Sequence, residues 1–327
     1  MEEMKRKRSF LKIGTYCGLF VLSMLLSVFG GFNYYANIPL ADLKKQYTYE
    51  DSKMMNIVGM NVHYRVTGTG EPLVLLHGTA SSLHTWDGWT KELSDQYQVI
   101  SLDLPGFGLT GKHFANDYSI KAYTDFLDVF LDKLGVTQIN LVGNSLGGHI
   151  AWQYALDHKN RVKKLILLNA SGFSKEDSEV TLAFQLANIP VVNKLMLRLT
   201  PKSLVESSLE EVYHNDEKIT DQLVNRVHSL QLRRGNRQAF IDKSSYEYAD
   251  RTADLKNITC PTLIQWGKAD AWLPVSWAND FKAAIPNAQM IIYDQAGHVP
   301  MEEIPVKTAQ DARQFLDNES MTSITEG

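Results

Sequence analysis

Cysteine is scarce in this chain, which has two thiols, Cys17 and Cys260, among 327 residues. The two lie far apart in the sequence and in different surroundings, so they form neither a disulfide framework nor a cysteine-rich metal site. No His-Glu-x-x-His pattern or similar spacing indicates a catalytic metal either. We therefore expect no structural zinc, no catalytic metal and no other cofactor.

The chain also lacks a strong excess of charge of either sign. Lys and Arg number 33 against 37 Asp and Glu, which gives a net charge of −4, and no long basic stretch follows the first dozen residues. A nucleic-acid-binding role is therefore disfavoured. Hydrophobic residues make up 44% and charged residues 21%, a balance that excludes disorder for most of the length. The length allows two domains, or one large α/β domain with an insertion.

One long uncharged run stands near the N-terminus. Residues 13–32 carry no charged side chain over 20 positions. As a helix rising about 1.5 Å per residue, they would span the roughly 30 Å of a bilayer's hydrocarbon. Five basic residues precede the run, against Lys44 and Lys45 after it, and this bias keeps the N-terminus cytoplasmic. We expect residues 1–35 to be a cytoplasmic basic tail and a single transmembrane anchor, with the rest of the chain outside.

Cleavage of this segment as a signal peptide, followed by secretion, is the alternative. A signal peptide has a shorter apolar core and a small-residue site of the Ala-x-Ala type, and none is found between Gly30 and Asn37. Residues 36–52 are polar and mixed in character. We expect them to form a tether between the anchor and the folded domain.

From Lys53 onward, short apolar runs alternate with longer helical patterns. This alternation is typical of a mostly parallel sheet covered by helices on both faces. About eight strands are expected, and the first two should form an antiparallel hairpin. The expected strands are residues 54–58, 61–66, 72–76, 99–103, 139–142, 164–168, 262–266 and 289–293. Helical patterns alone occupy residues 171–249 and predict a helical cap inserted on top of the sheet. The core then comprises residues 53–170 and 250–318, followed by a tail over 319–327.

A Gly-x-Ser-x-Gly motif with Ser145 at its centre lies between a predicted strand and a helical pattern. A nucleophile held in a strained strand-to-helix turn needs neighbours without Cβ atoms, and Gly143 and Gly147 meet this need. The free N–H groups at the start of the following helix can stabilise a developing negative charge. The motif alone is weak, but this context strengthens it. Ser145 is therefore the predicted nucleophile.

A serine nucleophile needs a histidine to accept its proton and an acid to orient that histidine. Asp270 follows the strand over 262–266, and His298 follows the last strand in a Gly-His-x-Pro setting. Loops at the carboxyl ends of parallel strands converge on one edge of the sheet, so both residues can meet Ser145 there. We predict Asp270 as the acid and His298 as the base.

Other acids and histidines are weaker candidates for these roles. Asp294 lies too close to His298 along the last strand, and the position after the sixth strand holds Asn169 rather than an acid. Asp103 is expected to fix its own loop. His77 closes a strand and is expected to brace the turn by hydrogen bonds, while the helix behind the nucleophile carries His149, which is also expected to be structural.

The chain from about Lys53 to Phe315 resembles an α/β-hydrolase. The resemblance rests on the order Ser, Asp, His and on two further motifs, His77-Gly78-Thr79 after the third strand and Asp103-Leu104-Pro105-Gly106-Phe107-Gly108 after the fourth. It implies that the backbone N–H groups of Thr79 and Leu146 form the oxyanion hole. Because main-chain groups donate, the Thr and Leu side chains matter little for this role.

Such a site is expected to catalyse acyl transfer, with hydrolysis of a carboxylic ester as the default outcome. The apolar stretch over residues 182–192 in the cap suggests a lipophilic acyl group, although core packing explains it equally well. An esterase or lipase with a small-molecule ester substrate, lipids included, is the favoured reading, and no obligate protein partner is evident. Fold alone does not decide the substrate.

Two alternatives remain at this point. The sequence Gly-Asn-Ser-Leu-Gly-Gly around Ser145 also resembles the elbow of hydrolases that cleave carbon-carbon bonds in aromatic ring-fission products. That group tends to have a glycine-rich turn where this chain has Thr79-Ala80-Ser81, and Trp where it has Val299. The other alternative is a non-catalytic binding protein with this fold, which would have no need of a complete Ser-His-Asp set.

Overall fold

The structure is a computed structural model that describes residue 18 and residues 35–173, 182–246 and 248–318. The predicted membrane anchor, apart from Gly18, and the tail over 319–327 lie outside these ranges. Among the described residues, no helix has both the length and the apolar character needed to cross a membrane.

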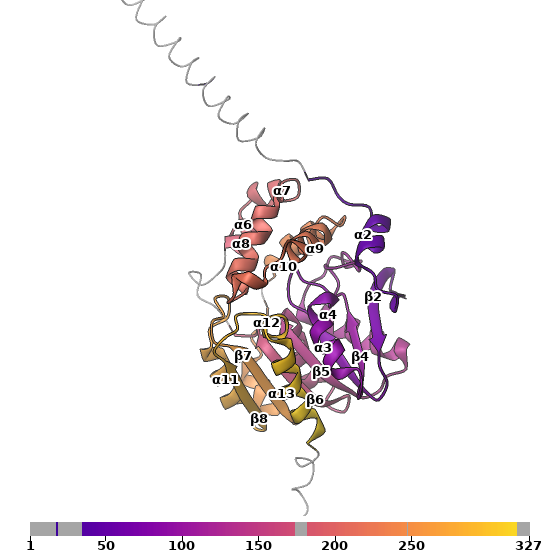
Figure 1. Ribbon diagram of the computed structural model, residues 1–327, viewed down its shortest axis with the longest axis vertical. Coiled ribbons are helices and arrows are strands. Elements are labelled where there is room, and N and C mark those ends of the chain that lie inside the picture. The colour runs from indigo at the N-terminus through magenta and orange to yellow at the C-terminus, as the bar shows by residue number, and fades with distance from the viewer. Residues whose placement is uncertain (1–17, 19–34, 174–181, 247, 319–327) are drawn as a thin grey trace, which may run out of the picture.

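An eight-stranded sheet forms the centre of the described chain, in the order β1-β2-β4-β3-β5-β6-β7-β8 (Figure 1). Its strands are β1 (Ser52–Ile57), β2 (Met60–Thr67), β3 (Glu71–Leu76), β4 (Tyr97–Leu102), β5 (Ile139–Ser145), β6 (Val162–Ala170), β7 (Thr262–Gly267) and β8 (Ala288–Tyr293). The pairs β1–β2 and β2–β4 are antiparallel, and every later pair is parallel. The predicted fold class, a mostly parallel sheet of about eight strands that opens with a hairpin, is confirmed.

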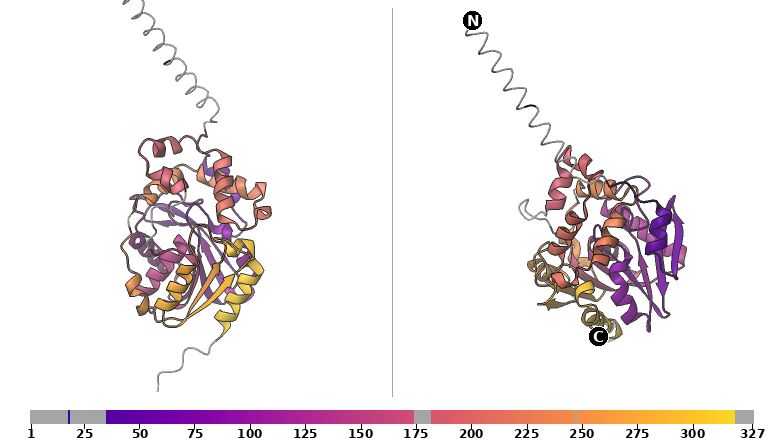
Figure 2. Two further views of the ribbon diagram at one scale, coloured as in Figure 1. Left: turned by 90° about the vertical axis from the view of Figure 1, so that its left-hand side faces the viewer. Right: turned by 45° about the horizontal axis from the view of Figure 1, so that its top comes forward.

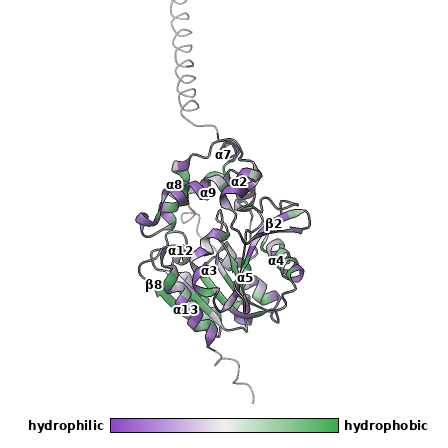
Figure 3. Ribbon diagram, turned by 45° about the vertical axis from the view of Figure 1, so that its right-hand side comes forward, coloured by the Kyte–Doolittle hydropathy of each residue, from purple (hydrophilic) through white to green (hydrophobic). Residues whose placement is uncertain are grey.

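Helices cover both faces of this sheet. One face packs on α4 (Ile120–Leu134), α5 (Leu146–Asp157) and α11 (Ser276–Ala284), and the other on α3 (Asp87–Leu93) and α13 (Pro305–Asp317). Strand β3 serves both layers: Val74 and Leu76 belong to the first core, whereas Leu73 and Leu75 belong to the second. Successive side chains of a strand point to opposite faces, so a strand buried on both sides is apolar throughout. Figure 3 shows this hydrophobic character along the strands.

Between β6 and β7 the chain leaves the sheet and forms a group of helices that we call the cap: α6 (Leu182–Asn188), α7 (Val192–Met196), α8 (Lys202–Val212), α9 (Asp221–Gln231) and α10 (Asn236–Ser244). Figures 1 and 2 show these helices gathered over one end of the sheet. Shorter helices complete the fold: η1 (Leu83–Trp86), η3 (Asp216–Lys218), η4 (Thr252–Asn257) and α12 (Pro300–Glu303). The cap therefore lies above the loops that follow the parallel strands.

The segment before β1 differs from the sequence expectation. Residues 36–52 are predicted to form a polar tether, but the structure contains helix α2 (Leu40–Tyr47) there. Leu43 is fully buried and packs with Leu109 and Leu230, the last of which belongs to α9 of the cap. This contact holds the start of the domain against the cap. It also stabilises α2 itself, because a helix of this length depends on tertiary packing for its stability.

Candidate active site

Ser145 lies at the sharp turn where β5 ends and α5 begins. Its backbone has φ 54° and ψ −116°, a conformation that residues with a side chain rarely adopt. A Cβ atom on Gly143 would lie 2.1 Å from the carbonyl oxygen of Gly147, and one on Gly147 would lie 2.2 Å from that of Leu76. Both positions must be glycine for strand and helix to pack this closely. The structure thus places Ser145 at a strained elbow, as its motif predicts.

Asp270 and His298 meet at the same edge of the sheet, after β7 and β8. Nδ1 of His298 lies 2.8 Å from Oδ2 of Asp270, and the Asp270 side chain is fully buried. The N–H groups of Trp272 and Leu273 donate to Oδ1 of Asp270 at 2.8 and 2.9 Å. Burial opposes ionisation, but the nearby His298 and the hydrogen bonds hold the pKa of Asp270 below its ordinary value. The carboxylate therefore stays charged beside the imidazole at neutral pH.

The second ring nitrogen of His298 is the open position of the site. Nε2 is buried and has no hydrogen-bond partner among the described residues, so the hydrogen bond expected from Ser145 is not formed in this structure. The segments that carry the two residues are nevertheless adjacent, since the side chain of Asn144, the residue before Ser145, donates to the His298 carbonyl oxygen at 3.0 Å. Such bonds are often long in a site without substrate and shorten when substrate binds.

Thr79 and Leu146 flank the nucleophile. Leu146 is the first residue of α5, where N–H groups have no acceptor within the helix. On the other side, a Cβ atom on Gly78, the residue before Thr79, would lie 3.1 Å from the Cβ of Ser145. Thr79 also lines the cavity that reaches His298. Both backbone N–H groups thus belong to segments that border Ser145.

His77 and His149 have structural surroundings. Nε2 of His77 accepts the N–H of Leu104 at 2.9 Å and its Nδ1 faces the Gly78 carbonyl oxygen at 2.7 Å, which fixes the turn before Thr79. Burial lowers the pKa of His77. His149 stacks on Trp152 with ring centroids 5.1 Å apart, and burial lowers its pKa to about 3. Both rings are neutral at pH 7.

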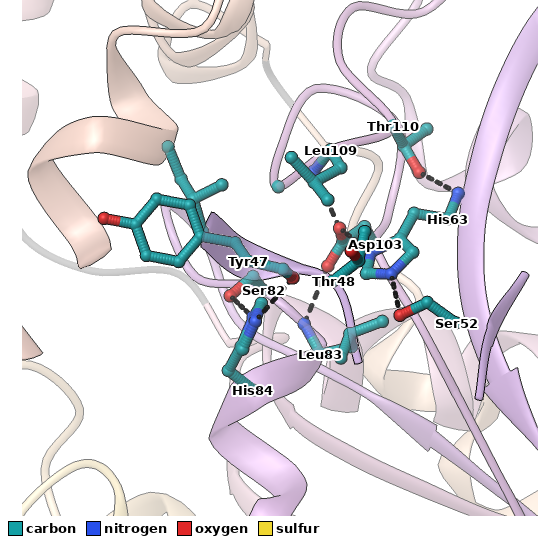
Figure 4. A network of polar contacts seen from close by, with 12 residues as sticks. Tyr47, Thr48, Ser52, His63, Ser82, Leu83, His84, Asp103, Leu109 and Thr110 are labelled. Atoms are coloured by element: carbon teal, nitrogen blue, oxygen red, sulfur yellow. Dashed lines mark hydrogen bonds and ion pairs between the residues drawn. The ribbon is translucent and has the colours of Figure 1, made fainter. Parts of the chain in front are cut away.

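Asp103 fixes its loop through a buried network, shown in Figure 4. Its carboxylate accepts the N–H groups of Leu83 at 2.8 Å and Leu109 at 2.7 Å, and lies 2.8 Å from Nδ1 of His63. Burial opposes the charge, but His63 holds the pKa of Asp103 well below its ordinary value. Because Leu83 follows the Gly78 turn closely in sequence, this network braces the same loop that carries Thr79.

Two residues that support the site have no role in the sequence prediction: Asn169, which is named there only because it is not an acid, and Glu303. Asn169 is the residue before the last of β6 and has φ 41°. Its amide nitrogen donates to Oδ2 of Asp270 at 2.6 Å, and its amide oxygen accepts the Gly267 N–H at 3.1 Å. Glu303 is buried, and its carboxylate accepts the N–H groups of Gly297 at 2.5 Å and His214 at 2.9 Å. Asn169 thus fixes the acid, and Glu303 ties the loop before His298 to the cap.

Asp294, the weaker candidate for the acid, lies away from Asp270 and His298. Asp294 is exposed at the surface and forms an ion pair with Lys268 at 2.7 Å. It therefore takes no part in this cluster.

Two adjacent cavities, which we call chambers, lie between the cap and the sheet and share lining residues such as Ala80, Val205 and Trp272; their empty space is about 840 and 750 Å³, open solvent at their mouths included. The first, which we call the apolar chamber, has a lining that includes Phe107, Phe184, Met196, Leu199, Leu204 and Phe240. The second reaches Thr79, Asn144 and His298, and we call it the polar chamber because these groups lie in it, although much of its remaining lining is apolar, including Leu209, Leu223 and Val227. Trp272 lines both chambers, and its ring lies 5.2 Å from that of His298.

The lining of the polar chamber includes an ion pair. Arg226 of α9 lies 3.7 Å from Glu302, and the Tyr213 hydroxyl donates to the same carboxylate at 2.9 Å. All three residues line the chamber. The site thus combines an apolar cavity lined by Trp272 with a second cavity at His298, in which a charge-balanced pair lies among apolar side chains.

Comparison with known proteins gives consistent matches. The family model described as alpha/beta hydrolase fold matches residues 71–305. A protein of Mycobacterium tuberculosis with no assigned activity is 30% identical over 78% of this chain and 77% of its own length. A 2-hydroxy-6-oxononadienedioate/2-hydroxy-6-oxononatrienedioate hydrolase of Cupriavidus pinatubonensis is 27% identical over 72% of this chain and 84% of its own.

A solved structure resembles nearly the whole chain. The crystal structure of a bacterial membrane phospholipase A superposes with a TM-score of 0.73 and 27% identity. The match covers 92% of this chain and 98% of the phospholipase chain. The chain is thus similar both to a protein named as a phospholipase and to one named as a hydrolase of a 2-hydroxy-6-oxo dienedioate.

Proposed function

Because the chain belongs to the alpha/beta hydrolase fold family, we propose that it is a serine hydrolase that cleaves carboxylic esters with lipophilic acyl groups. The observation that carries the proposal is the hydrogen bonding of the two ring nitrogens of His298. Its Nδ1 is bound to a buried carboxylate, while its Nε2 is buried without a partner at the polar chamber, next to the segment that holds Ser145. An imidazole held in this way is suited to accept the proton of a serine hydroxyl.

In the first half of the proposed reaction, Oγ of Ser145 attacks the ester carbonyl carbon and its proton passes to Nε2 of His298. Asp270 stabilises the imidazolium through Nδ1–H, and the N–H groups of Thr79 and Leu146 stabilise the negative carbonyl oxygen. The carbon-oxygen bond to the alcohol then breaks, and the alcohol leaves with the proton from His298. The product bound to the enzyme is an acyl ester of Ser145.

In the second half, His298 takes a proton from a water molecule, whose oxygen adds to the acyl carbonyl carbon. The bond between that carbon and Oγ of Ser145 breaks, and the serine recovers its proton from His298. The carboxylic acid is released, and the site returns to its initial protonation state. No cofactor is required.

The apolar chamber supports a lipophilic acyl group. Phe184 packs against Phe240 and Trp272 with ring centroids 5.2 and 5.9 Å apart, so aromatic surface covers the cavity beside His298. Each buried methylene of an acyl chain contributes about 0.8 kcal/mol of transfer free energy. A long chain therefore gains several kcal/mol by filling this chamber, whereas an acetyl group gains almost nothing.

Cleavage of carbon-carbon bonds in ring-fission products is the second candidate, because several relatives carry that activity in their names. The residues around this site favour the ester. Thr79-Ala80-Ser81 follows Gly78 where a glycine-rich turn is typical of that group, and Val299 stands in place of Trp. Arg226, which lines the polar chamber, is also already paired with Glu302.

A substrate panel tests the proposal. Full-length protein in detergent is assayed with p-nitrophenyl acetate, octanoate and palmitate and with a ring-fission dienoate. We expect the octanoate and palmitate to be cleaved with higher kcat/KM than the acetate, and Ser145→Ala to abolish all turnover, whereas Ser207→Ala, an exposed serine of α8, leaves it intact. Preferred turnover of the dienoate would establish the second candidate, and esterase activity retained by Ser145→Ala would remove Ser145 from the mechanism.

A further inference from the structure

Apolar side chains are exposed at the end of the cap, where α6 is joined to α7. Ile189, Val191 and Leu195 are 46%, 74% and 42% exposed. We call these three residues the cap tip. Val191 also has a positive φ of 78°, which β-branched residues rarely adopt. A neighbouring group of exposed apolar residues, one of them on strained backbone, marks a contact surface rather than an ordinary loop.

A groove lined by cations continues from the cap tip. Its charged residues are Lys112, Arg198, Arg233, Arg234 and Arg237, and its other lining residues are uncharged. We call it the basic groove. Two of its guanidinium groups are held by main-chain oxygens, Arg233 by Thr110 at 2.9 Å and Arg237 by Tyr35 at 3.1 Å. Lys194, exposed on α7 beside Leu195, adds a further cation. The groove therefore has a concentrated positive potential that attracts anionic groups.

The described chain starts beside these two features. The N–H of Tyr35 donates to the Arg198 carbonyl oxygen at 3.2 Å, and Asn37 lines the basic groove. Figures 1 and 2 show this first segment, in indigo, next to α7. Residues 1–34 precede this point, and they include the uncharged run over 13–32 that is predicted to enter a bilayer. A membrane reached by that run would lie next to the cap tip and the basic groove.

The same part of the cap also borders the apolar chamber. Leu195 of α7 is exposed, whereas its neighbour Met196 and the nearby Leu199 line the chamber. Arg237 lines both the chamber and the basic groove. One short segment therefore separates the outer surface from the cavity proposed to hold the acyl group.

We propose that the cap tip and the basic groove together dock on the surface of a bilayer that contains anionic phospholipid. Ile189, Val191 and Leu195 enter the interface between headgroups and acyl chains, and the cations of the groove bind lipid phosphates. Docking places the segment between α7 and the apolar chamber at the membrane surface, so that a lipid acyl chain passes from the bilayer into the chamber. The docking itself stands independently of catalysis, while the passage of the acyl chain rests on the proposed esterase function.

The first test measures depth in the membrane. Full-length protein with Cys17→Ala and Cys260→Ala is reconstituted into vesicles of phosphatidylcholine and phosphatidylglycerol, and an environment-sensitive fluorophore is attached at Val191→Cys or Leu195→Cys. The control is Val129→Cys, on the exposed side of α4, where the parent side chain is 37% exposed. We expect blue-shifted emission and quenching by spin-labelled lipid at positions 191 and 195, and neither at 129. Emission that is blue-shifted without quenching by lipid would indicate a second protein copy at the cap tip and overturn the proposal, as would unshifted emission.

The second test removes charge. Lys112→Gln, Lys194→Gln and Arg234→Gln are combined, because all three side chains are exposed. We expect the ratio of docked to undocked protein, read from the quenched fraction, to fall roughly fivefold per removed charge in anionic vesicles. The matched control combines Lys133→Gln, Lys159→Gln and Lys256→Gln, which are exposed before β5, β6 and β7 at the opposite end of the sheet, and should change nothing. Equal effects of the two triple variants would refute a specific role for the groove.

The third test links docking to turnover. Val191→Asp combined with Leu195→Asp should lower hydrolysis of a long-chain ester embedded in vesicles at least tenfold, while leaving soluble p-nitrophenyl butyrate unaffected. Val129→Asp should affect neither substrate. Full activity on the embedded ester would overturn the proposed path of the acyl chain. Absence of hydrolysis of both p-nitrophenyl butyrate and p-nitrophenyl octanoate in the parent protein would instead refute the proposed function, and the fluorescence result would still decide whether the cap tip docks.

Discussion

Replacing Ser145 with glycine should make the protein more stable while removing its activity. Ser145 has φ 54° and ψ −116°, and its side chain forms no capping hydrogen bond at the start of α5. The hydroxyl therefore contributes nothing to the helix that a substitution would remove. A non-glycine residue held in such a conformation costs about 1–3 kcal/mol. Glycine adopts it without strain, because the penalty comes from the Cβ atom.

The expected gain is smaller than the strain itself. Glycine loses more backbone freedom on folding than other residues, which costs about 0.5–1 kcal/mol. Ser145→Gly should therefore be roughly 0.5–2 kcal/mol more stable than Ser145→Ala, which keeps the Cβ atom. A difference of this size raises the melting temperature by about 2–4 °C per kcal/mol.

The assay is a pair of thermal melts in the same detergent, together with p-nitrophenyl octanoate hydrolysis. Both variants should lack turnover, so the alanine variant isolates the loss of the hydroxyl and the glycine variant adds the relief of strain. Equal melting temperatures, or a less stable glycine variant, would show that the strain does not exceed the entropic cost of glycine, about 0.5–1 kcal/mol, and would refute the expected gain.

Three further predictions concern the base, the buried imidazole and the chamber. His298→Gln should lower kcat for ester hydrolysis by about 10²–10⁴-fold, with the far-ultraviolet spectrum unchanged. Burial lowers the pKa of His149 to about 3, below its unfolded value, so the unfolded chain binds the extra proton and stability should fall with decreasing pH between about 6.5 and 3. His149→Phe, which can still pack on Trp152, should lessen this fall by up to about 1.4 kcal/mol per pH unit in denaturant titrations; an unchanged slope would contradict a neutral His149. Leu204→Trp, which fills the apolar chamber, should lower the ratio of kcat/KM for palmitate over acetate, and an unchanged ratio would place the acyl chain elsewhere.

Much of the fold could be predicted because buried parallel strands are apolar on both faces. Strands β3 and β5 stand out as continuous runs in the sequence for this reason. Helix α2 could not be recognised, because its composition is polar and Leu43 is its one buried residue, with Leu40 and Tyr47 packing beside it only partly buried. Its partners, Leu109 and Leu230, are distant in the sequence. The tether predicted there reflects composition, whereas the helix reflects packing.

In the candidate site, too, features with a local signature could be predicted, whereas contacts between distant residues could not. Ser145 has a local signature, because the turn itself requires glycines at fixed spacing. The meeting of Asp270 with His298 follows from the convergence of loops at the carboxyl ends of parallel strands. Asn169 lies 101 positions from Asp270 in sequence, and nothing local reveals that its amide binds the carboxylate. The contact of Glu303 with His214 depends likewise on how the cap is folded over the sheet.

The hydrogen bonds between the end of α8 and the loop that carries His298 restrict how the cap can move away from the sheet. The N–H of His298 donates to the Val212 carbonyl oxygen at 2.8 Å, at the end of α8, and Glu303 bridges Gly297 to His214. If the end of α8 moved away from the sheet, it would displace His298, the proposed proton acceptor, and the proposed reaction could not proceed. The fold thereby fixes one end of the cap to the loop that carries His298, and this attachment preserves the alignment of the imidazole with Asp270.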